Sequence, residues 1–297
     1  MSAVFALLHQ SPAFFLGLVF IVSLMVGSFL NVVIYRLPVM MERRWKAEFN
    51  DYFKAETNNN NDTQPAQTER FDLIKPDSTC PKCGHKIRAW ENIPVISWLL
   101  LRGKCASCKT PISIRYPSVE LITALLSVWV AATFGFGSAG ILAVFVTWIL
   151  VALTFIDADT MLLPDELTLP LLWLGLIASL FTTFVSPHEA IIGAAAGYLS
   201  LWSVYWLFKL LTGKEGMGYG DFKLLAALGA FTGWQGLPII IILSSFVGAV
   251  VGIALLVFKR NGVGQAIPFG PYLAAAGWLT LLYGEQIQQT YLRWVLA

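Results

Sequence analysis

The chain has 297 residues, of which 57% are hydrophobic and 13% are charged, whereas soluble domains carry about 25% charged residues. Apolar runs of about 18 or more residues recur, so the composition excludes an ordinary soluble domain and predicts a protein that crosses a membrane several times. The net charge of +2 gives no indication of a nucleic-acid partner, and we predict none.

The apolar stretches predict an all-α polytopic fold with about eight transmembrane helices. The first stretch lacks a cleavage site of the A-x-A type, so we interpret it as an uncleaved span. Residues 1–35 are expected to form the first transmembrane helix, 36–116 a small inserted loop domain, and 117–297 a seven-helix membrane core. The predicted spans are 13–35, 117–135, 138–156, 164–185, 190–211, 220–236, 238–258 and 268–284.

Basic residues are distributed unevenly between the two sides of these spans. Fourteen of the 20 Lys and Arg residues lie between Arg36 and Arg115, and residues 1–12 contain none. Because cytoplasmic loops are enriched in Lys and Arg, the N-terminus is predicted to lie outside and the 36–116 loop in the cytoplasm.

All four cysteines lie in this loop, in two C-x2-C pairs separated by 21 residues: Cys80 with Cys83, and Cys105 with Cys108. This spacing resembles that of a zinc ribbon, although the separation is slightly longer than usual. Two disulfides or a redox-active pair are the alternative, which a cytoplasmic location disfavours because thiols stay reduced there. A closed four-cysteine site is structural, and since four sulfurs fill it we interpret His85 as a surface histidine.

Two further segments of the loop have distinct compositions. The apolar run from Ile93 to Leu101 is too short to span a membrane. We predict that it forms the core of the zinc domain, in preference to lying on the membrane surface. The segment from Thr57 to Glu69 is polar and low in complexity, so we predict a linker there.

The stretch "GMGYGD", residues 216–221, places a carboxylate at the mouth of an apolar segment. Residues 222–236 cover only about 22 Å as a helix, so we predict that the helix begins near the glycines. Gly218 and Gly220 are expected to adopt positive φ and to allow a close approach of backbone. Asp221 either caps the helix or, as an ionisable group at membrane depth, is a functional candidate.

A second acidic cluster, "DADTMLLPDE" at residues 157–166, is predicted at the same face. Asp165 and Glu166 follow a proline and suit the first turn of a helix. Asp157 and Asp159 project differently from a helix, so only one should face the bundle. Asp157 is closest to the apolar span and is our candidate.

Six motifs in order resemble the bifunctional type IV prepilin peptidases, polytopic leader peptidases of pilus and type II secretion systems. In that family one catalytic aspartate lies seven residues before a proline and the other closes G-x-G-D. The resemblance places these roles on Asp157 and Asp221. The motifs are "GSFLNVVIYRLP", the paired C-x2-C knuckles, "IRYPSVELITALL", "DADTMLLPD", "GMGYGD" and "IPFGPYL".

The resemblance implies a membrane aspartic endopeptidase of the bacterial inner membrane. Its substrates would be type IV prepilins and pseudopilins, whose short basic leader is removed at the cytoplasmic membrane edge. It also implies methylation of the new N-terminus with S-adenosylmethionine. No glycine-rich Rossmann motif is present, so the methyl-donor site is predicted in the loop, at Glu91 and Asn92.

Three other functions remain open at this point. They are a presenilin-like intramembrane protease, an ion-coupled transporter using the two aspartates, and a zinc-domain membrane scaffold. The zinc knuckles argue against the first two, and no inverted repeat supports transport. The motif "IPFGPYL" is interpreted as a turn that begins the last span, with Pro268 and Pro271 as its breakers, rather than as a substrate contact.

Overall fold

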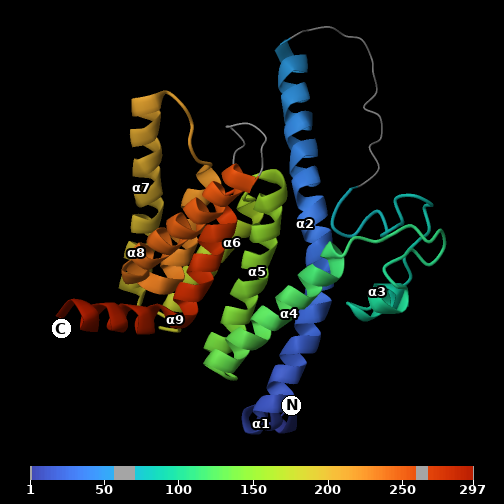
Figure 1. The fold of residues 1–297 in the computed structure, drawn as a ribbon, viewed down its shortest axis with the longest axis horizontal. Coiled ribbons are helices and arrows are strands. Elements are labelled where there is room, and N and C mark those ends of the chain that lie inside the picture. The colour runs from blue at the N-terminus through green and yellow to red at the C-terminus, as the bar shows by residue number, and fades with distance from the viewer. Residues whose placement is uncertain (1, 57–70, 259–266, 297) are drawn as a thin grey trace. The chain divides into compact units, whose positions relative to one another are not determined.

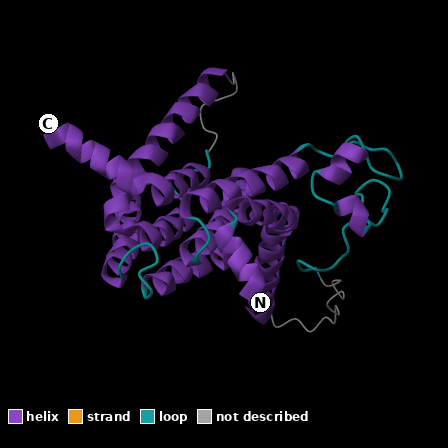
Figure 2. Ribbon diagram, turned by 90° about the horizontal axis from the view of Figure 1, so that it is seen from below, coloured by secondary structure: helices purple, strands orange, loops and turns teal. Residues whose placement is uncertain are grey.

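The computed structural model describes residues 2–56, 71–258 and 267–296. Within these ranges every regular element is a helix (Figure 2), which confirms the all-α prediction. The predicted linker at 57–69 lies outside them. The elements are α1 (Ser2–Gln10), α2 (Pro12–Glu56), the 3-10 helix η1 (Ala89–Asn92), α3 (Ile96–Leu100), α4 (Arg115–Phe134), α5 (Ser138–Thr160), α6 (Asp165–Ser179), α7 (Pro187–Thr212), α8 (Tyr219–Phe258) and α9 (Gly270–Leu296).

Five helices in the described ranges, α2, α4, α5, α7 and α8, are long and apolar enough to cross a membrane. The prediction of eight spans therefore stays a prediction. The segments predicted as 220–236 and 238–258 are both contained in α8, which is interrupted at Gly233 (φ 69°, ψ 175°). The first predicted span is longer than expected, since α2 continues to Glu56.

The chain divides into two compact units, and the first comprises residues 19–125. This unit includes parts of two membrane helices, so it is wider than the predicted 36–116 loop. Gly27 of α2 packs directly on α4, because a Cβ there would lie 2.7 Å from Glu120 Cα. Arg36 of α2 is buried and donates to the carbonyl oxygens of Asp72 (2.9 Å) and Pro76 (2.6 Å). These bonds fasten the start of the cysteine segment to α2.

The second unit comprises residues 1–18 and 126–297, and α8 lies at its centre. Helix α8 contacts α6, α7 and α9 (Figure 1). Its first turns provide the core, with Phe222, Leu224 and Leu225 fully buried. Asp221 directly precedes this core, so the packing of α8 fixes the position of that carboxyl.

Helices α7 and α8 touch backbone to backbone at two glycines. A Cβ on Gly193 would collide with the carbonyl oxygen of Gly229, and one on Gly229 with that of Gly193. Gly193 and Gly197 form a G-x-x-x-G pattern in α7, and Gly229 and Gly233 form another in α8. Such patterns allow membrane helices to pack at short range, and our sequence analysis did not use this signal.

We expect Gly229→Ala to destabilise the protein by about 1–3 kcal/mol, the usual cost of overpacking. The added methyl group meets main-chain atoms of α7 rather than a flexible side chain, so the two helices have to separate. Gly17→Ala is the matched control, because Gly17 lies in a helix with nothing within 4 Å of its Cβ position. Thermal unfolding in detergent checks this; equal midpoints for the two variants would contradict it.

Candidate active site

Asp157 lies in the last turn of α5 and its side chain is directed into the bundle. The residue is 5% exposed, whereas Asp159, two positions later, is exposed. This confirms the prediction that only one of the two faces the interior. The helix ends at Thr160, and the next residue, Met161, adopts a left-handed conformation (φ 54°) and donates its N–H to the Asp157 carbonyl oxygen (2.9 Å).

Asp221 lies in the first turn of α8, which begins at Tyr219 as predicted from the glycines. It is 8% exposed. The expectation of positive φ at Gly218 and Gly220 is wrong, since neither has it. The close approach is found instead: a Cβ on Gly220 would lie 2.6 Å from Leu163 Cβ. Gly220 is therefore needed for space rather than for its backbone angles.

The end of α5 and the beginnings of α8 and α9 meet around the two carboxyls. Leu163, just after α5, touches Gly220 and also Gly270, whose Cβ position lies 3.1 Å from Leu163 Cδ2. The Gly270 N–H donates to Asp157 Oδ2 at 2.9 Å. Leu163 thus links the backbone beside Asp221 to the backbone that binds Asp157. Two acids 64 positions apart in the chain are thereby brought to one place.

Gly270 is a site residue that the sequence analysis missed. It belongs to "IPFGPYL", which we interpreted as a turn that begins the last span rather than as a substrate contact. In the structure its N–H is the first of α9 and points at Asp157 Oδ2. This hydrogen bond fixes the orientation of the Asp157 carboxyl at the beginning of α9.

We expect Gly270→Ala to reduce the leader cleavage that the sequence resemblance implies by about 10- to 100-fold, because a small displacement of a reacting group has effects of this size. The new Cβ would lie 2.7 Å from Asp157 Oδ2, so the carboxyl has to move. Initial rates of prepilin cleavage check this against Gly17→Ala, which leaves the site untouched. An unchanged rate in a folded Gly270→Ala protein would contradict the positioning role.

An ion pair and a small cavity adjoin the acid pair. Lys223 of α8 binds both carboxylate oxygens of Asp165 at 2.7 Å and so joins the beginnings of α6 and α8.

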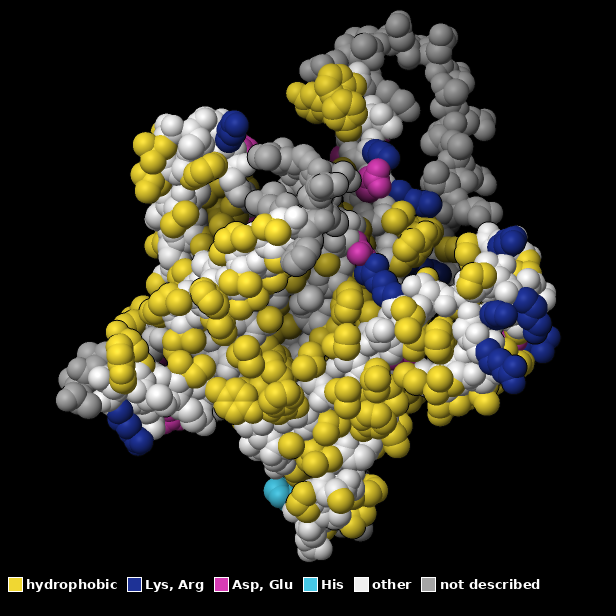
Figure 3. Space-filling view, viewed as in Figure 1, with side chains coloured by type: hydrophobic (Ala, Val, Ile, Leu, Met, Phe, Trp, Pro, Cys, Tyr) yellow, Lys and Arg dark blue, Asp and Glu magenta, His cyan; other side chains and the backbone are white. Residues whose placement is uncertain are grey.

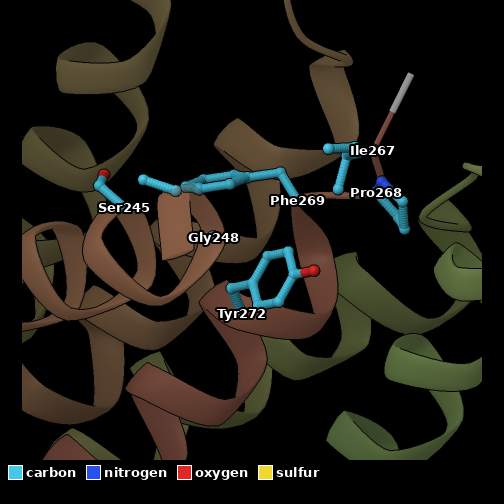
Figure 4. Close-up of a pocket in the computed structure, with 7 residues that line it drawn as sticks. Ser245, Gly248, Ile267, Pro268, Phe269 and Tyr272 are labelled. Atoms are coloured by element: carbon cyan, nitrogen blue, oxygen red, sulfur yellow. The ribbon is translucent and has the colours of Figure 1, made fainter. Parts of the chain in front are cut away.

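A cavity of about 300 Å³ lies between α8 and the start of α9 (Figure 4). The Phe269 ring extends across it toward Ser245 and Gly248, with Tyr272 below (Figure 4). Two residues that line the cavity, Pro268 and Phe269, directly precede Gly270, whose N–H binds Asp157.

The four cysteines converge on a second site. Their sulfur atoms all lie within 4.8 Å of one another, with Sγ–Sγ distances of 3.8 Å for Cys80–Cys108 and 4.0 Å for Cys83–Cys105. A tetrahedron with metal–sulfur bonds of about 2.3 Å has edges of about 3.8 Å. All four are free thiols, and their arrangement suits one tetrahedral metal ion.

The two knuckles have the same backbone geometry. In the first, Cys80 N–H donates to His85 O (2.9 Å) and Gly84 N–H to Cys80 O (2.9 Å); in the second, Cys105 N–H donates to Thr110 O (2.8 Å) and Lys109 N–H to Cys105 O (3.1 Å).

The second knuckle also favours a thiolate. The Thr110 hydroxyl, 3.1 Å from Cys108 Sγ, and the Thr110 backbone N–H lower the pKa of Cys108 to about 6. The thiolate is the form of cysteine that binds metal.

The residues predicted to hold the methyl donor lie beside the first knuckle. The Glu91 carboxylate accepts from the Arg88 N–H (3.0 Å) and lies 3.0 Å from His85 Nε2. Its side chain is 5% exposed, whereas Asn92 is exposed. The Arg88 N–H, and then His85, lower the pKa of Glu91. His85 is thus a half-buried partner of Glu91 rather than a plain surface residue.

The prediction that the run from Ile93 to Leu101 forms the core of the zinc domain is wrong. Helix α3 contains no buried residue, and Ile96, Leu99 and Leu100 are 54%, 62% and 78% exposed. Trp98 is partly buried, and its Nε1 donates to Ile112 O (3.2 Å). The domain is held by the knuckles and backbone bonds, and so its apolar run remains at the surface.

Fold and site together define a helical membrane protein in which two buried acids lie at the junction of α5, α8 and α9. Residues 21–134 match the model of the bacterial peptidase A24 N-terminal domain, and residues 144–253 match that of the type IV leader peptidase family. The chain belongs to this family.

Curated relatives match the chain over all or nearly all of its length. The chain is 57% identical over 296 residues to a prepilin leader peptidase/N-methyltransferase of Aeromonas salmonicida, covering 100% of both chains. A relative of the same name from Aeromonas hydrophila is 58% identical and covers 98% of this chain and 99% of its own length. A third, from Pseudomonas aeruginosa, is 56% identical and covers 96% of each chain. No solved structure matches the chain.

Proposed function

We propose that the protein removes the short basic leader from type IV prepilins and pseudopilins as a membrane aspartic endopeptidase, and then methylates the new N-terminal amine. Family membership supports both activities. The observation that carries the peptidase is the meeting of Asp157 and Asp221, both buried, at the junction of α5, α8 and α9. We assign the catalytic roles to these two residues.

Two carboxyls so close cannot both ionise easily, so one keeps a proton and the other is a carboxylate. The carboxylate takes a proton from a water molecule as the water oxygen attacks the scissile carbonyl carbon. The protonated carboxyl donates its proton to the carbonyl oxygen. The tetrahedral intermediate then collapses: the C–N bond breaks, the leaving nitrogen receives the proton that the first carboxyl took from water, and the second carboxyl recovers its proton from a hydroxyl of the intermediate.

We assign the four cysteines to one structural Zn²⁺, because a closed set of four thiolates is the donor set typical of structural zinc. This ion would fix the two knuckles relative to one another and would have no open position for substrate.

S-adenosylmethionine supplies the methyl group when it is bound.

We retain Glu91 and Asn92 as candidate contacts of the methyl donor. Asn92 is the more accessible of the two, since Glu91 is engaged by Arg88 and His85. The amine to be methylated has a pKa of about 7.7–8.0, so a useful fraction is neutral at pH 7. Positioning of the two reactants is therefore the main requirement for this step.

We place the protein in the bacterial inner membrane with its N-terminus in the periplasm. The cysteine loop and both aspartates would then lie at the cytoplasmic face, in agreement with the excess of Lys and Arg in residues 36–116. The partners in this arrangement are the bilayer and the prepilins. Cleavage would occur where a basic leader meets the apolar helix of its substrate.

Membranes that contain the protein, incubated with a prepilin and methyl-labelled S-adenosylmethionine, test both activities in one reaction. We expect a shortened pilin that carries the label on its new N-terminal nitrogen. Cleavage without label would reject the methyltransferase assignment only. If the prepilin remained intact while the protein was correctly inserted, the whole proposal would be rejected.

A further inference from the structure

Helix α3 presents an unusually apolar surface in the segment that follows the first cysteine knuckle. Large apolar side chains are exposed on a single short turn of helix and on the residues that flank it. A contiguous patch of this kind on a folded protein marks a contact with another apolar phase. The exposed residues are Trp90, Ile93, Ile96, Leu99, Leu100 and Ile114.

The beginning of α3 is anchored to a membrane helix. The Val95 N–H donates to Glu120 Oε2 at 2.7 Å, and Glu120 is 7% exposed within α4. Glu120 lies five residues after Arg115, the first residue of α4, which is about 7.5 Å along a helix. The bond therefore holds α3 near the first residues of α4, which is one of the helices long and apolar enough to cross a membrane.

The anchor also fixes the backbone of this segment. Val95 has φ 61°, a conformation that a β-branched residue adopts only when its surroundings impose it. The backbone of Glu120 is itself packed against Gly27 of α2. Contacts with two membrane helices, α2 and α4, thus determine where the apolar turn lies.

The charges around the apolar surface suit a lipid surface. Arg88, Arg102 and Lys104 are exposed on either side of α3, and Lys and Arg side chains lie beside the apolar ones on this lobe (Figure 3). Apolar and aromatic side chains flanked by Lys and Arg are typical of segments that lie in the membrane interface, where anionic headgroups attract the basic residues.

We propose that the apolar surface of α3 is inserted into the boundary between headgroups and acyl chains, in the leaflet where α4 begins. The metal-binding lobe is thereby fastened to the membrane at two points, by the Val95–Glu120 bond and by the lipid contact. The occupant of the surface is lipid. A second protein or another part of this chain would be an alternative occupant that the experiment below distinguishes.

The test uses the full chain with a genetically encoded fluorescent amino acid at Leu100, reconstituted in vesicles of phosphatidylethanolamine and phosphatidylglycerol. We expect brominated acyl chains to quench this label at least about threefold more strongly than a label at Lys82, since an interfacial segment lies about 5–10 Å into the boundary. Lys82 is exposed on the first knuckle. A label at Ile242, 68% exposed in the membrane helix α8, calibrates full lipid contact.

Aqueous iodide should show the reverse order, with the label at Lys82 quenched most. If iodide quenched the label at Leu100 as strongly as that at Lys82, the surface would lie in water and the proposal would be wrong. A label at Leu100 that neither quencher reached would be covered by protein, which would also overturn it. Retained metal binding and prepilin cleavage show that each labelled protein is folded.

Discussion

Replacing Asp157 or Asp221 with asparagine should lower the rate of leader removal by about a thousandfold, in the range found for general acid–base groups. A carboxamide is close in size to a carboxyl, so the fold should be kept. In the Asp157→Asn protein the amide oxygen can still accept the Gly270 N–H that Asp157 Oδ2 accepts at 2.9 Å. What is lost is the ability to exchange a proton with water or with the scissile carbonyl.

Asp159→Asn is the matched control for the pair. Asp159 lies on the same helix turn as Asp157 but is exposed, so we expect its substitution to leave cleavage within about twofold of the unmodified protein, as for an ordinary surface position. Initial rates on a purified prepilin provide the measurement, with methylation of a pre-cleaved pilin as a second readout. Normal processing by either Asp157→Asn or Asp221→Asn would remove the catalytic assignment.

Replacing Cys105 with serine should weaken metal binding by more than about 100-fold, because even the outer partners of metal ligands contribute 10- to 100-fold. Cys105 is buried, and its N–H and carbonyl oxygen both form knuckle hydrogen bonds. Binding of a structural metal is coupled to folding. We therefore expect loss of the metal to expose the loop to proteolysis.

Ser107→Ala is the control for this variant, since Ser107 is an exposed residue between the two ligands of the second knuckle. Metal content by mass spectrometry and limited proteolysis of the loop are the measurements. Full metal content in the Cys105→Ser protein would contradict the four-cysteine site. If a chelator removed the metal and left both cleavage and methylation unchanged, the loop would be central to neither activity.

The class of protein was predictable because its signals are local in the sequence. Composition and apolar runs indicate a membrane protein directly, since hydrocarbon tolerates few charges. The C-x2-C pairs specify their own knuckle geometry, and the structure brings their sulfurs within 4.8 Å of one another. Helical periodicity indicated that only one of Asp157 and Asp159 faces the bundle, and Asp157 was chosen because it is closest to the apolar span.

Three features were decided only by the tertiary structure, since each depends on neighbours that are distant in the sequence. The N–H of Gly270 reaches Asp157 because α5 and α9 meet there. Gly220 is required for space because Leu163 lies against it. The run containing α3 proved to be surface rather than core, because a segment held by cysteine knuckles needs no apolar interior and the Val95–Glu120 bond keeps it at α4. Apolar composition determines that a segment avoids water, but whether it meets protein or lipid depends on which surfaces the completed fold leaves open.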